Sequence, residues 1–337
     1  VGRGLKPVWL EQLFLIRQRS RSNSLISCEF TGLCSRAHFY CEPQAMELAH
    51  YRARKFTYDC ASGRWEEQAV NLRMSHEPFG EGGMRVVYRA REILEDGSEV
   101  DAVVKRIKPG IGLDPDTNYH EAMTQMVAES YAQDFNKACA QQGLRTSIAF
   151  LPVSVIKIEG MPGMHEPLCL EPFLAGDYVK HSDNAGHIEK DDDVAAAFSY
   201  FTYINSEKLL VVCDIQGVGT FYTDPQIHTF DGEGFGAGNL GPEGLQRFVH
   251  THRHNLLCEE LGLPNPDAGL SDEELARKLQ DVEDGMSSLG IDDTGMAGEG
   301  MPMAFGLGGS TVSSTSTWDN QQYRSGMTAL AQMFARR

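Results

Sequence analysis

The chain has 337 residues, of which 41% are hydrophobic and 9% aromatic, so it is long and apolar enough to bury the core of a sizeable globular domain. Its formal net charge is −17 at pH 7, which argues against a basic surface for direct nucleic-acid binding. All its apolar runs are shorter than the ~20 residues of a membrane-spanning helix, so no membrane partner is expected.

The first predicted element is a basic flank over residues 1–48. In "VWLEQLFLIRQRSRS", Trp9, Leu13 and Ile16 fall on one helical face, and arginines follow. A basic amphipathic helix is typical of calmodulin targets, and the same composition suits an organelle transit peptide. A solvated tail is the third interpretation, and the sequence leaves all three open.

From about residue 50 the pattern is that of an α+β domain. Alternating apolar residues predict a β-hairpin over residues 55–74, with its turn at the Ser-Gly pair 62–63. A second hairpin is predicted over residues 82–108, with its turn at the Asp-Gly pair 96–97. Two antiparallel hairpins in succession predict an antiparallel sheet.

A long helix is predicted over residues 118–142, because Met123, Val127 and Phe135 recur on one face. A further helix, starting at "GPEG" and ended by Gly262, should follow the last strand. The strands expected between the helices cover residues 150–158, 167–174 and 209–213.

The last segment, residues 266–337, is predicted to be a low-complexity tail. Residues 266–300 hold ten acidic residues against Arg277 and Lys278, and the remainder is rich in Gly, Ser and Met. The eight cysteines contain no CxxC pair, which favours reduced thiols and a cytoplasmic protein.

A glycine-rich turn precedes a lysine on a predicted strand. In "PFGEGGMRVVY", Gly80, Gly82 and Gly83 would let the backbone approach a phosphate, and Arg85 would add positive charge, although many hairpin turns are glycine-rich for structural reasons. Lys105 follows in "VVKRI", where its apolar neighbours indicate burial, and a buried ammonium needs an anion beside it. This is the arrangement that holds the phosphates of ATP in protein kinases.

Polar residues follow the strand over 209–213, in "DIQGVGTFYTDPQ". Asp214 and Gln216 are expected to point to the same side and to supply oxygen ligands to Mg²⁺. Asp224 follows a glycine-rich bend that would bring it back near the metal, where a carboxylate can orient or deprotonate a substrate hydroxyl. The HRD, DFG and APE motifs of typical protein kinases do not occur.

Residues 236–241, "GAGNLG", match the GxGxxG pattern of dinucleotide-binding folds. That pattern requires a strand leading into its first glycine, and the preceding "HTFDGEGF" is a turn-rich loop. A dinucleotide site is therefore not expected here.

Taken together, "PFGEGGMR", "VVK", "CDIQGVGTFYTDPQIHT" and "GNLG" followed by "HTHRHNLLCEELGL" resemble the atypical α-kinase family. The resemblance covers roughly residues 50–264 and implies a two-lobed α+β kinase fold with ATP between the lobes. The implied catalytic domain spans residues 49–265. Its antiparallel-sheet N-lobe covers about 49–170, and its mixed C-lobe covers about 171–265.

The resemblance also implies roles for particular residues. Lys105 would contact the ATP phosphates, Asp214 and Gln216 would hold Mg²⁺, and Asp224 would be the catalytic Asp. Glu171 would belong to the hinge on the adenine side. A loop near the peptide substrate would comprise Gly236, Gly238, Asn239 and Gly241.

The implied function is that of a Ser/Thr protein kinase using ATP and Mg²⁺. Within the family the resemblance is to kinases of elongation factor 2, which implies that factor as substrate, a restraint on translation elongation, and calmodulin as a possible partner. The alternatives are a catalytically inactive nucleotide-binding scaffold and an α-kinase with another substrate. Retention of Lys105, Asp214 and Asp224 favours an enzyme.

The family also implies a structural zinc ion held by two histidines and two cysteines. Here His252 and Cys258 match, but His254 stands where a cysteine is expected and Tyr200 where a histidine is expected. We therefore expect a site with three good ligands and weaker zinc binding, in which His250 or Cys213 could supply a fourth ligand. Ordinary helix histidines are the alternative interpretation.

Overall fold

The computed structural model describes residues 47–114, 116–160, 164, 166–188, 192–271, 273–275 and 277. The predicted flank over residues 1–48 therefore lies almost entirely outside the described residues, as does most of the predicted tail over 266–337. None of the helices in the described part combines the length and apolar character that a membrane span requires.

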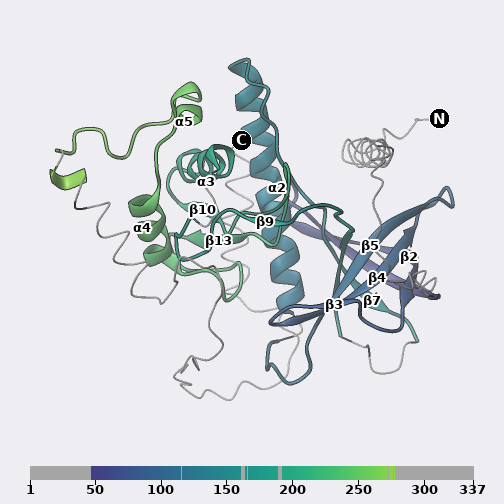
Figure 1. Ribbon diagram of the computed structural model, residues 1–337. Coiled ribbons are helices and arrows are strands. Elements are labelled where there is room, and N and C mark those ends of the chain that lie inside the picture. The colour runs from purple at the N-terminus through teal and green to yellow at the C-terminus, as the bar shows by residue number, and fades with distance from the viewer. Residues whose placement is uncertain are drawn as a thin grey trace, which may run out of the picture. The chain divides into compact units, whose positions relative to one another are not determined.

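The first half of the described chain builds a seven-stranded sheet in which every pairing is antiparallel (Figure 1). Its strand order is β2-β1-β7-β8-β5-β4-β3, and an additional pairing of β2 with β4 joins its two sides. The strands are β1 (Leu48–Asp59), β2 (Arg64–Ser75), β3 (Gly80–Glu81), β4 (Arg85–Ile93), β5 (Glu99–Ile107), β7 (Ser154–Ile158) and β8 (Leu168–Pro172).

The second half combines two smaller sheets with helices. One sheet has the order β6-β12-β11-β9 and the other pairs β10 with β13. Their strands are β6 (Ala149–Phe150), β9 (Val179–Lys180), β10 (Leu210–Cys213), β11 (Gln216–Val218), β12 (Phe221–Thr223) and β13 (Gln226–Thr229). The helices are α2 (Thr117–Gln141), α3 (Asp193–Asn205), α4 (Gly241–Thr251) and α5 (Leu256–Glu260).

Both predicted hairpins are confirmed. β1 and β2 pair along their whole length, and the Gly63 N–H donates to the Asp59 carbonyl at the turn between them. β4 and β5 pair in the same way around the Asp-Gly turn. The apolar residues that alternate along these strands meet inside the sheet, where Leu72, Met74 and Val104 are fully buried in one cluster.

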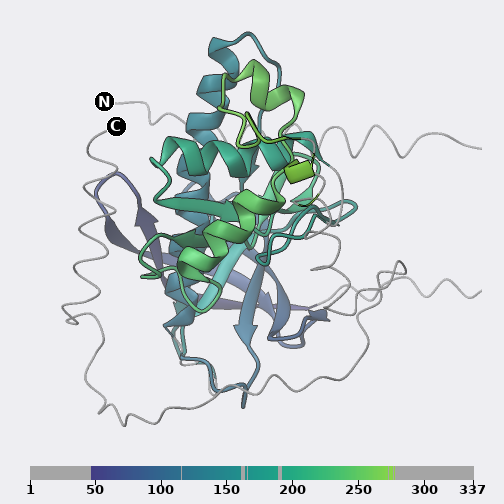
Figure 2. The same cartoon turned by 90° about the vertical axis from the view of Figure 1, so that its left-hand side faces the viewer.

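The predicted long helix is confirmed as α2, which lies between the seven-stranded sheet and helices α3 to α5 (Figures 1 and 2). Near its start, Tyr119 packs in a cluster with residues of β7 and β8. Further along, Phe135 packs in the largest cluster with residues of α3 and β10. The helix ends before Gly143, whose φ of 73° is the left-handed conformation typical of helix C-termini. Helix α2 thus contributes to two cores.

The predicted strand over residues 150–158 is divided between two sheets. β6 pairs with β12 in the smaller sheet, whereas β7 pairs with β1 and β8 in the larger one. Pro152 lies between them, and proline has no N–H for a sheet hydrogen bond. The continuous apolar run therefore changes sheet at this residue.

The predicted helix that begins at "GPEG" is also broken, into α4 and α5. His252 takes an extended conformation with ψ of 131°, which ends α4. Asn255 then caps α5, because its side chain accepts a hydrogen bond from the Cys258 N–H at 3.0 Å. The break has a consequence for chemistry, since it folds His252, His254 and Cys258 toward one another.

Candidate active site

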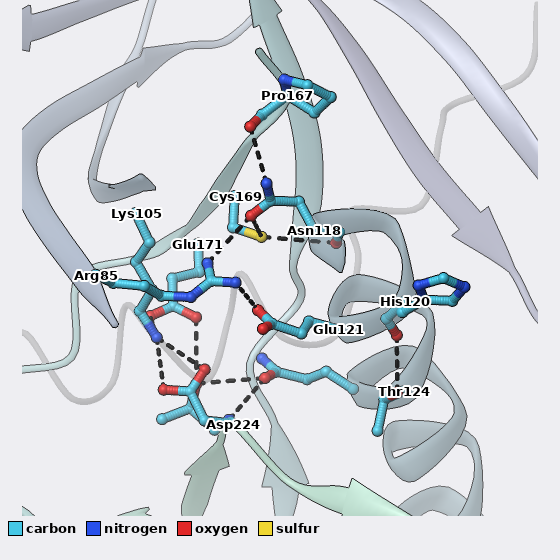
Figure 3. Close-up of polar contacts among 12 residues, drawn as sticks. Arg85, Lys105, Asn118, His120, Glu121, Thr124, Pro167, Cys169, Glu171 and Asp224 are labelled. Atoms are coloured by element: carbon cyan, nitrogen blue, oxygen red, sulfur yellow. Dashed lines mark hydrogen bonds and ion pairs between the residues drawn. The ribbon is translucent and has the colours of Figure 1, made fainter. Parts of the chain in front are cut away.

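Lys105 is the centre of a charged cluster between the two halves of the described chain (Figure 3). Its Nζ lies 2.8 Å from Glu171 Oε1 and 2.7 Å from Asp224 Oδ2. Burial alone would lower the pKa of Lys105, but the carboxylates of Glu171 and Asp224 outweigh burial and hold that pKa above its ordinary value. Lys105 is therefore charged at any physiological pH.

Strand register explains why Glu171 meets Lys105. Lys105 pairs with Cys169 and Val103 pairs with Glu171. The two charged residues therefore lie on neighbouring strands, offset by two residues in the register, and their side chains point to the same face of the sheet. Glu171 is only 6% exposed, and the Thr223 hydroxyl donates to its Oε2 at 3.2 Å. The carboxylate expected at the adenine-side hinge is thus directed toward the lysine.

Asp214 and Asp224 stand at two bends of the backbone. Asp214 follows β10 and Asp224 lies between β12 and β13. Both have left-handed backbones, with φ of 56° and 51°. Non-glycine residues adopt this conformation rarely, and asparagine and aspartate do so more readily than most. Such strained positions cluster at active sites and ligand clamps.

Asp214 has a different electrostatic environment from Asp224. Burial raises the pKa of Asp214 to about 6, although Lys180 Nζ lies 3.3 Å from its Oδ1 and partly opposes that effect. The side chain of Asp224 is 51% exposed, and both of its oxygens accept hydrogen bonds from Lys105. One carboxylate therefore has a raised pKa of about 6, and the other pairs with Lys105.

Gln216 links the two bends. Its Nε2 donates to the backbone carbonyl of Asp214 at 3.3 Å and to that of Asp224 at 3.2 Å. This leaves Oε1 as the atom that could ligate a metal. Gly217 allows the bends to come together, since a Cβ there would lie 2.0 Å from the Phe221 carbonyl oxygen.

The glycine-rich turn has no structural need for its glycines. A Cβ added at Gly80, Gly82 or Gly83 would meet no described atom within 4 Å, and none of these residues has a positive φ. Neither packing nor backbone conformation explains them. Glycine at these positions leaves the backbone open to the close approach of a ligand.

Arg85 does not point freely toward this turn. Its guanidinium donates to Asn118 Oδ1 at 3.2 Å and to Glu121 Oε2, both on α2 (Figure 3). The expectation that it adds charge to a phosphate site stays a prediction. Its observed contacts attach strand β4 to helix α2.

Sequence analysis missed a row of polar residues on α2. Asn118, Glu121 and Gln125 are spaced three and four residues apart, so they share one helical face. Asn118 and Glu121 contact Arg85, whereas Gln125 contacts the backbone of Asp224. A polar stripe beside the apolar face of a buried helix was the available signal for these residues.

The loop over residues 236–241 is organised by its own side chains. Asn239 Oδ1 accepts from the backbone N–H groups of Thr229 and Gly241, and its Nδ2 donates to the Thr229 hydroxyl. Gly241 has a φ of 63°, and a Cβ at Gly238 would lie 1.6 Å from the side chain of Gln226. Asn239 therefore stabilises the loop internally, and the expected place of this loop near the peptide substrate stays a prediction.

The buried ring of His228 is hydrogen-bonded to this loop. It is 1% exposed, its Nδ1 accepts from the Leu240 N–H at 3.1 Å, and its Nε2 donates to the Asn184 carbonyl at 2.7 Å. Burial lowers the pKa of His228, so the neutral ring is the native form. The ring also packs against the start of α4, because a Cβ at Gly244 would lie 2.4 Å from it.

His252, His254 and Cys258 form a second group of possible ligands. Their ligand atoms all lie within 4.8 Å of one another, and Cys258 Sγ lies 3.9 Å from His252 Nε2. His254 Nδ1 is buried and has no hydrogen-bond partner among the described residues. These donors fit the nitrogen and sulfur set that Zn²⁺ prefers.

Tyr200 does not act as a fourth donor. Its ring stacks on His252 with centroids 4.2 Å apart, and its hydroxyl donates to the Pro264 carbonyl at 2.7 Å. Burial raises the pKa of Tyr200 to about 12, so the phenol stays protonated. Cys213, another candidate for the fourth place, contacts His228 at 3.4 Å.

Comparisons with known proteins agree with this arrangement. The profile of the Alpha-kinase family matches residues 80–258. Alpha-protein kinase 1 of Dictyostelium discoideum is 36% identical over 223 residues, which cover 66% of this chain and 16% of that protein. Eukaryotic elongation factor 2 kinase of Homo sapiens is 33% identical over 228 residues, which cover 64% of this chain and 30% of that protein. The chain thus matches less than a third of either relative's length.

Solved structures extend the comparison to the fold. The alpha-kinase domain of myosin-II heavy chain kinase A in complex with AMP-PNP has a TM-score of 0.59 and 28% sequence identity, covering 64% of this chain and 97% of that domain. The apoenzyme of the same domain matches equally well, with a TM-score of 0.59. The architecture built by the seven-stranded sheet, α2 and the second half is that of these domains.

Proposed function

The chain belongs to the alpha-kinase family, and on that premise we propose that it is a protein kinase that transfers the γ-phosphate of ATP to a serine or threonine of a protein substrate. The observation that carries the proposal is the meeting of Lys105, Glu171 and Asp224 from three separate strands or bends. Relatives support it, since a solved domain of similar fold is described as a complex with AMP-PNP.

Nucleotide binding would use the glycine-rich turn and Lys105. The backbone around Gly82 is free of side chains, and the ammonium of Lys105 is a donor for phosphate oxygens. Asp224 is one of the anions that now face this ammonium. A phosphate group would therefore compete with Asp224 for Lys105.

The donor set fits Mg²⁺, which prefers oxygen ligands. Two carboxylates, Asp214 and Asp224, stand at bends joined by Gln216. When bound, the ion would neutralise part of the charge on the phosphates. Asp214 and Gln216 Oε1 are the groups that we propose would hold it.

The proton acceptor that we propose is Asp224, with Asp214 as metal ligand. The side chain of Asp224 is half-exposed and therefore open to a substrate hydroxyl, whereas that of Asp214 is largely buried. The hydroxyl proton of the substrate passes to Asp224, its oxygen bonds to the γ-phosphorus, and the bond to the bridging oxygen of ADP breaks. Lys105 balances the charge of the departing phosphates.

Elongation factor 2 is the substrate that we propose, with calmodulin as an activating partner and a cytoplasmic location. A 33% identical relative is named for its action on that factor. The free cysteines of the described part agree with a reducing compartment. A 34% identical relative is named as a myosin heavy chain kinase, so a myosin tail is the specific alternative substrate.

A structural zinc ion is the further cofactor that we propose. His252, His254 and Cys258 would hold it with three protein ligands, and His254 Nδ1, which has no hydrogen-bond partner in the described part of the chain, supports this. Such an ion would stabilise the segment between α4 and α5.

A phosphotransfer experiment tests the kinase proposal. Purified protein is incubated with radiolabelled ATP and, separately, with elongation factor 2, a myosin tail or a generic basic protein, with and without Ca²⁺–calmodulin. Transfer to elongation factor 2 that is lost in Asp214→Asn supports the proposal. ATP binding without transfer to any protein would favour the inactive scaffold instead.

A further inference from the structure

Gln125 is a buried residue of α2 whose side chain is hydrogen-bonded to the backbone of Asp224. It is 2% exposed, and both ends of its amide are hydrogen-bonded. Its Oε1 accepts from the Asp224 N–H at 2.8 Å, and its Nε2 donates to the Leu151 carbonyl at 2.6 Å. The Thr223 hydroxyl lies 3.3 Å from this Oε1, but its single proton is directed to Glu171 Oε2 at 3.2 Å.

Only one orientation of the amide satisfies these partners. The Leu151 carbonyl can only accept a hydrogen bond and the Asp224 N–H can only donate one. A flipped amide would place two acceptors together at Leu151 and two donors together at Asp224. The carbonyl of Leu151 therefore fixes which atom of Gln125 faces Asp224.

The Asp224 N–H needs this acceptor because of its backbone conformation. With a φ of 51°, Asp224 lies in a region that non-glycine residues occupy only when surrounding contacts impose it. A buried N–H without a partner would add a desolvation penalty to that strain. Release of the bend would move the carboxylate that now faces Lys105 (Figure 3).

We propose that Gln125 is a positioning residue for phosphoryl transfer, which holds Asp224 in its left-handed conformation through a neutral hydrogen bond. This inference rests on the proposed kinase function. The amide is suited to the position because it accepts a hydrogen bond without bringing another negative charge into the cluster. The charged groups that face this region from the surrounding elements are Glu121 on α2, Glu171 on β8, Lys105 on β5 and Asp224 itself.

The pH dependence of the Gln125→Glu variant distinguishes a positioning role of Gln125 from a role in overall stability. A protonated glutamic acid has the shape of glutamine, with one donor for Leu151 and one acceptor for Asp224. An ionised glutamate keeps only the acceptor and repels Asp224 and Glu171. We expect the activity of this variant, relative to the wild type at each pH, to be within about threefold at pH 6 and to fall at least about tenfold by pH 8.5.

Gln125→Leu removes the acceptor at every pH. Its relative activity should be low throughout and should show no pH dependence. The matched controls are Gln133→Glu and Gln133→Leu, two turns further along α2 at an exposed position, and both should behave as the wild type. Should the leucine variant fail to fold, the nearly isosteric glutamate variant still decides the question.

Hydrogen exchange provides a readout independent of activity. In the nucleotide-free protein, Gln125→Leu should speed amide exchange in the segment from Phe221 to Thr229 while the rest of α2 exchanges as before. A flat activity ratio for Gln125→Glu between pH 6 and 8.5, or unchanged exchange at this segment, would overturn the proposal. A wild-type protein that transfers no phosphate would instead overturn the kinase function, and the exchange measurement would still test Gln125.

Discussion

The ammonium of Lys105 lies 2.7 Å from the carboxylate of Asp224, although 119 residues separate them in the chain. One belongs to the seven-stranded sheet and the other to the bend before β13. The cluster is therefore assembled by contacts between distant parts of the chain. Asp224 and Glu171 are the two anions beside the ammonium of Lys105.

Lys105→Met should abolish phosphotransfer and also destabilise the protein. Sequence alone suggests that only an anion partner is lost, but Glu171 would remain buried and unpaired, which typically costs about 3–5 kcal/mol. Chemical denaturation and the phosphotransfer assay measure the two effects. The exposed Lys137→Met is the control, and the double variant Lys105→Met/Glu171→Gln should regain stability without activity. Activity of Lys105→Met above a few per cent of wild type would contradict the role of Lys105.

The pH dependence of kcat/KM at limiting Mg²⁺ should reflect the protonation of Asp214. Because the pKa of Asp214 is raised to about 6 and a metal ligand must be ionised, activity of the wild type should rise as pH increases through 6 and then level off. Asp214→Asn should be inactive across the range. A wild-type profile that is flat between pH 5 and 7 would show that protonation of Asp214 does not limit metal binding.

Asp214 should also make the protein less stable at higher pH. Its folded pKa lies above the ordinary value of 3.8, so the folded state binds the proton more tightly, and that stabilisation is lost as pH rises through about 6. Asp214→Asn should therefore gain thermal stability over the wild type at pH 8 and lose that advantage at pH 4. Equal melting temperatures at pH 8 would mean that Lys180 compensates the buried charge fully.

Acid should destabilise the protein through His228. Burial lowers the pKa of His228 in the folded protein below the ordinary 6.5. The unfolded chain therefore binds a proton at a pH at which the folded protein does not, and the free energy of unfolding falls as pH drops below 6.5. The groups facing the ring, Cys213 and Arg247, offer no compensating negative charge. His228→Gln should show a shallower loss of melting temperature between pH 7 and 5. Exposed His50→Gln should leave the slope unchanged.

Purified protein should contain zinc close to one ion per chain, held more weakly than by four protein ligands. A chelator should lower the melting temperature, and Tyr200→His should raise both zinc affinity and stability by adding a fourth donor. Tyr203→His, one turn along α3, is the control and should change neither. A folded, active protein without zinc would mean that the Tyr200 stack and its bond to Pro264 have replaced the metal.

Local patterns explain what the sequence predicted of the fold. The hairpins and α2 follow from alternation, turn residues and helical periodicity, which are properties of neighbouring residues. The break between α4 and α5 could not be predicted in this way, because apolar residues continue across it at helical spacing. It depends on burial of His252 against Tyr200, a contact between distant parts of the chain.

The candidate site, too, could be predicted only in part from the sequence. Residue chemistry singled out Lys105, Asp214 and Asp224, since a buried lysine and paired carboxylates are unusual in any sequence. The contacts of Glu171 depend on the register between β5 and β8, and those of Gln125 on how α2 crosses the bend at Asp224. Register and crossing are set by tertiary packing, which short-range patterns do not encode.

Helix α2 has a thermodynamic consequence. Because Tyr119 packs against the large sheet and Phe135 packs in the core with α3, neither half can melt without exposing part of the same helix. The described domain should therefore unfold in one cooperative transition, with equal calorimetric and van't Hoff enthalpies. A ligand that contacts only the strand carrying Lys105 would then raise the melting temperature of α3 and β10 by the same amount as that of the sheet.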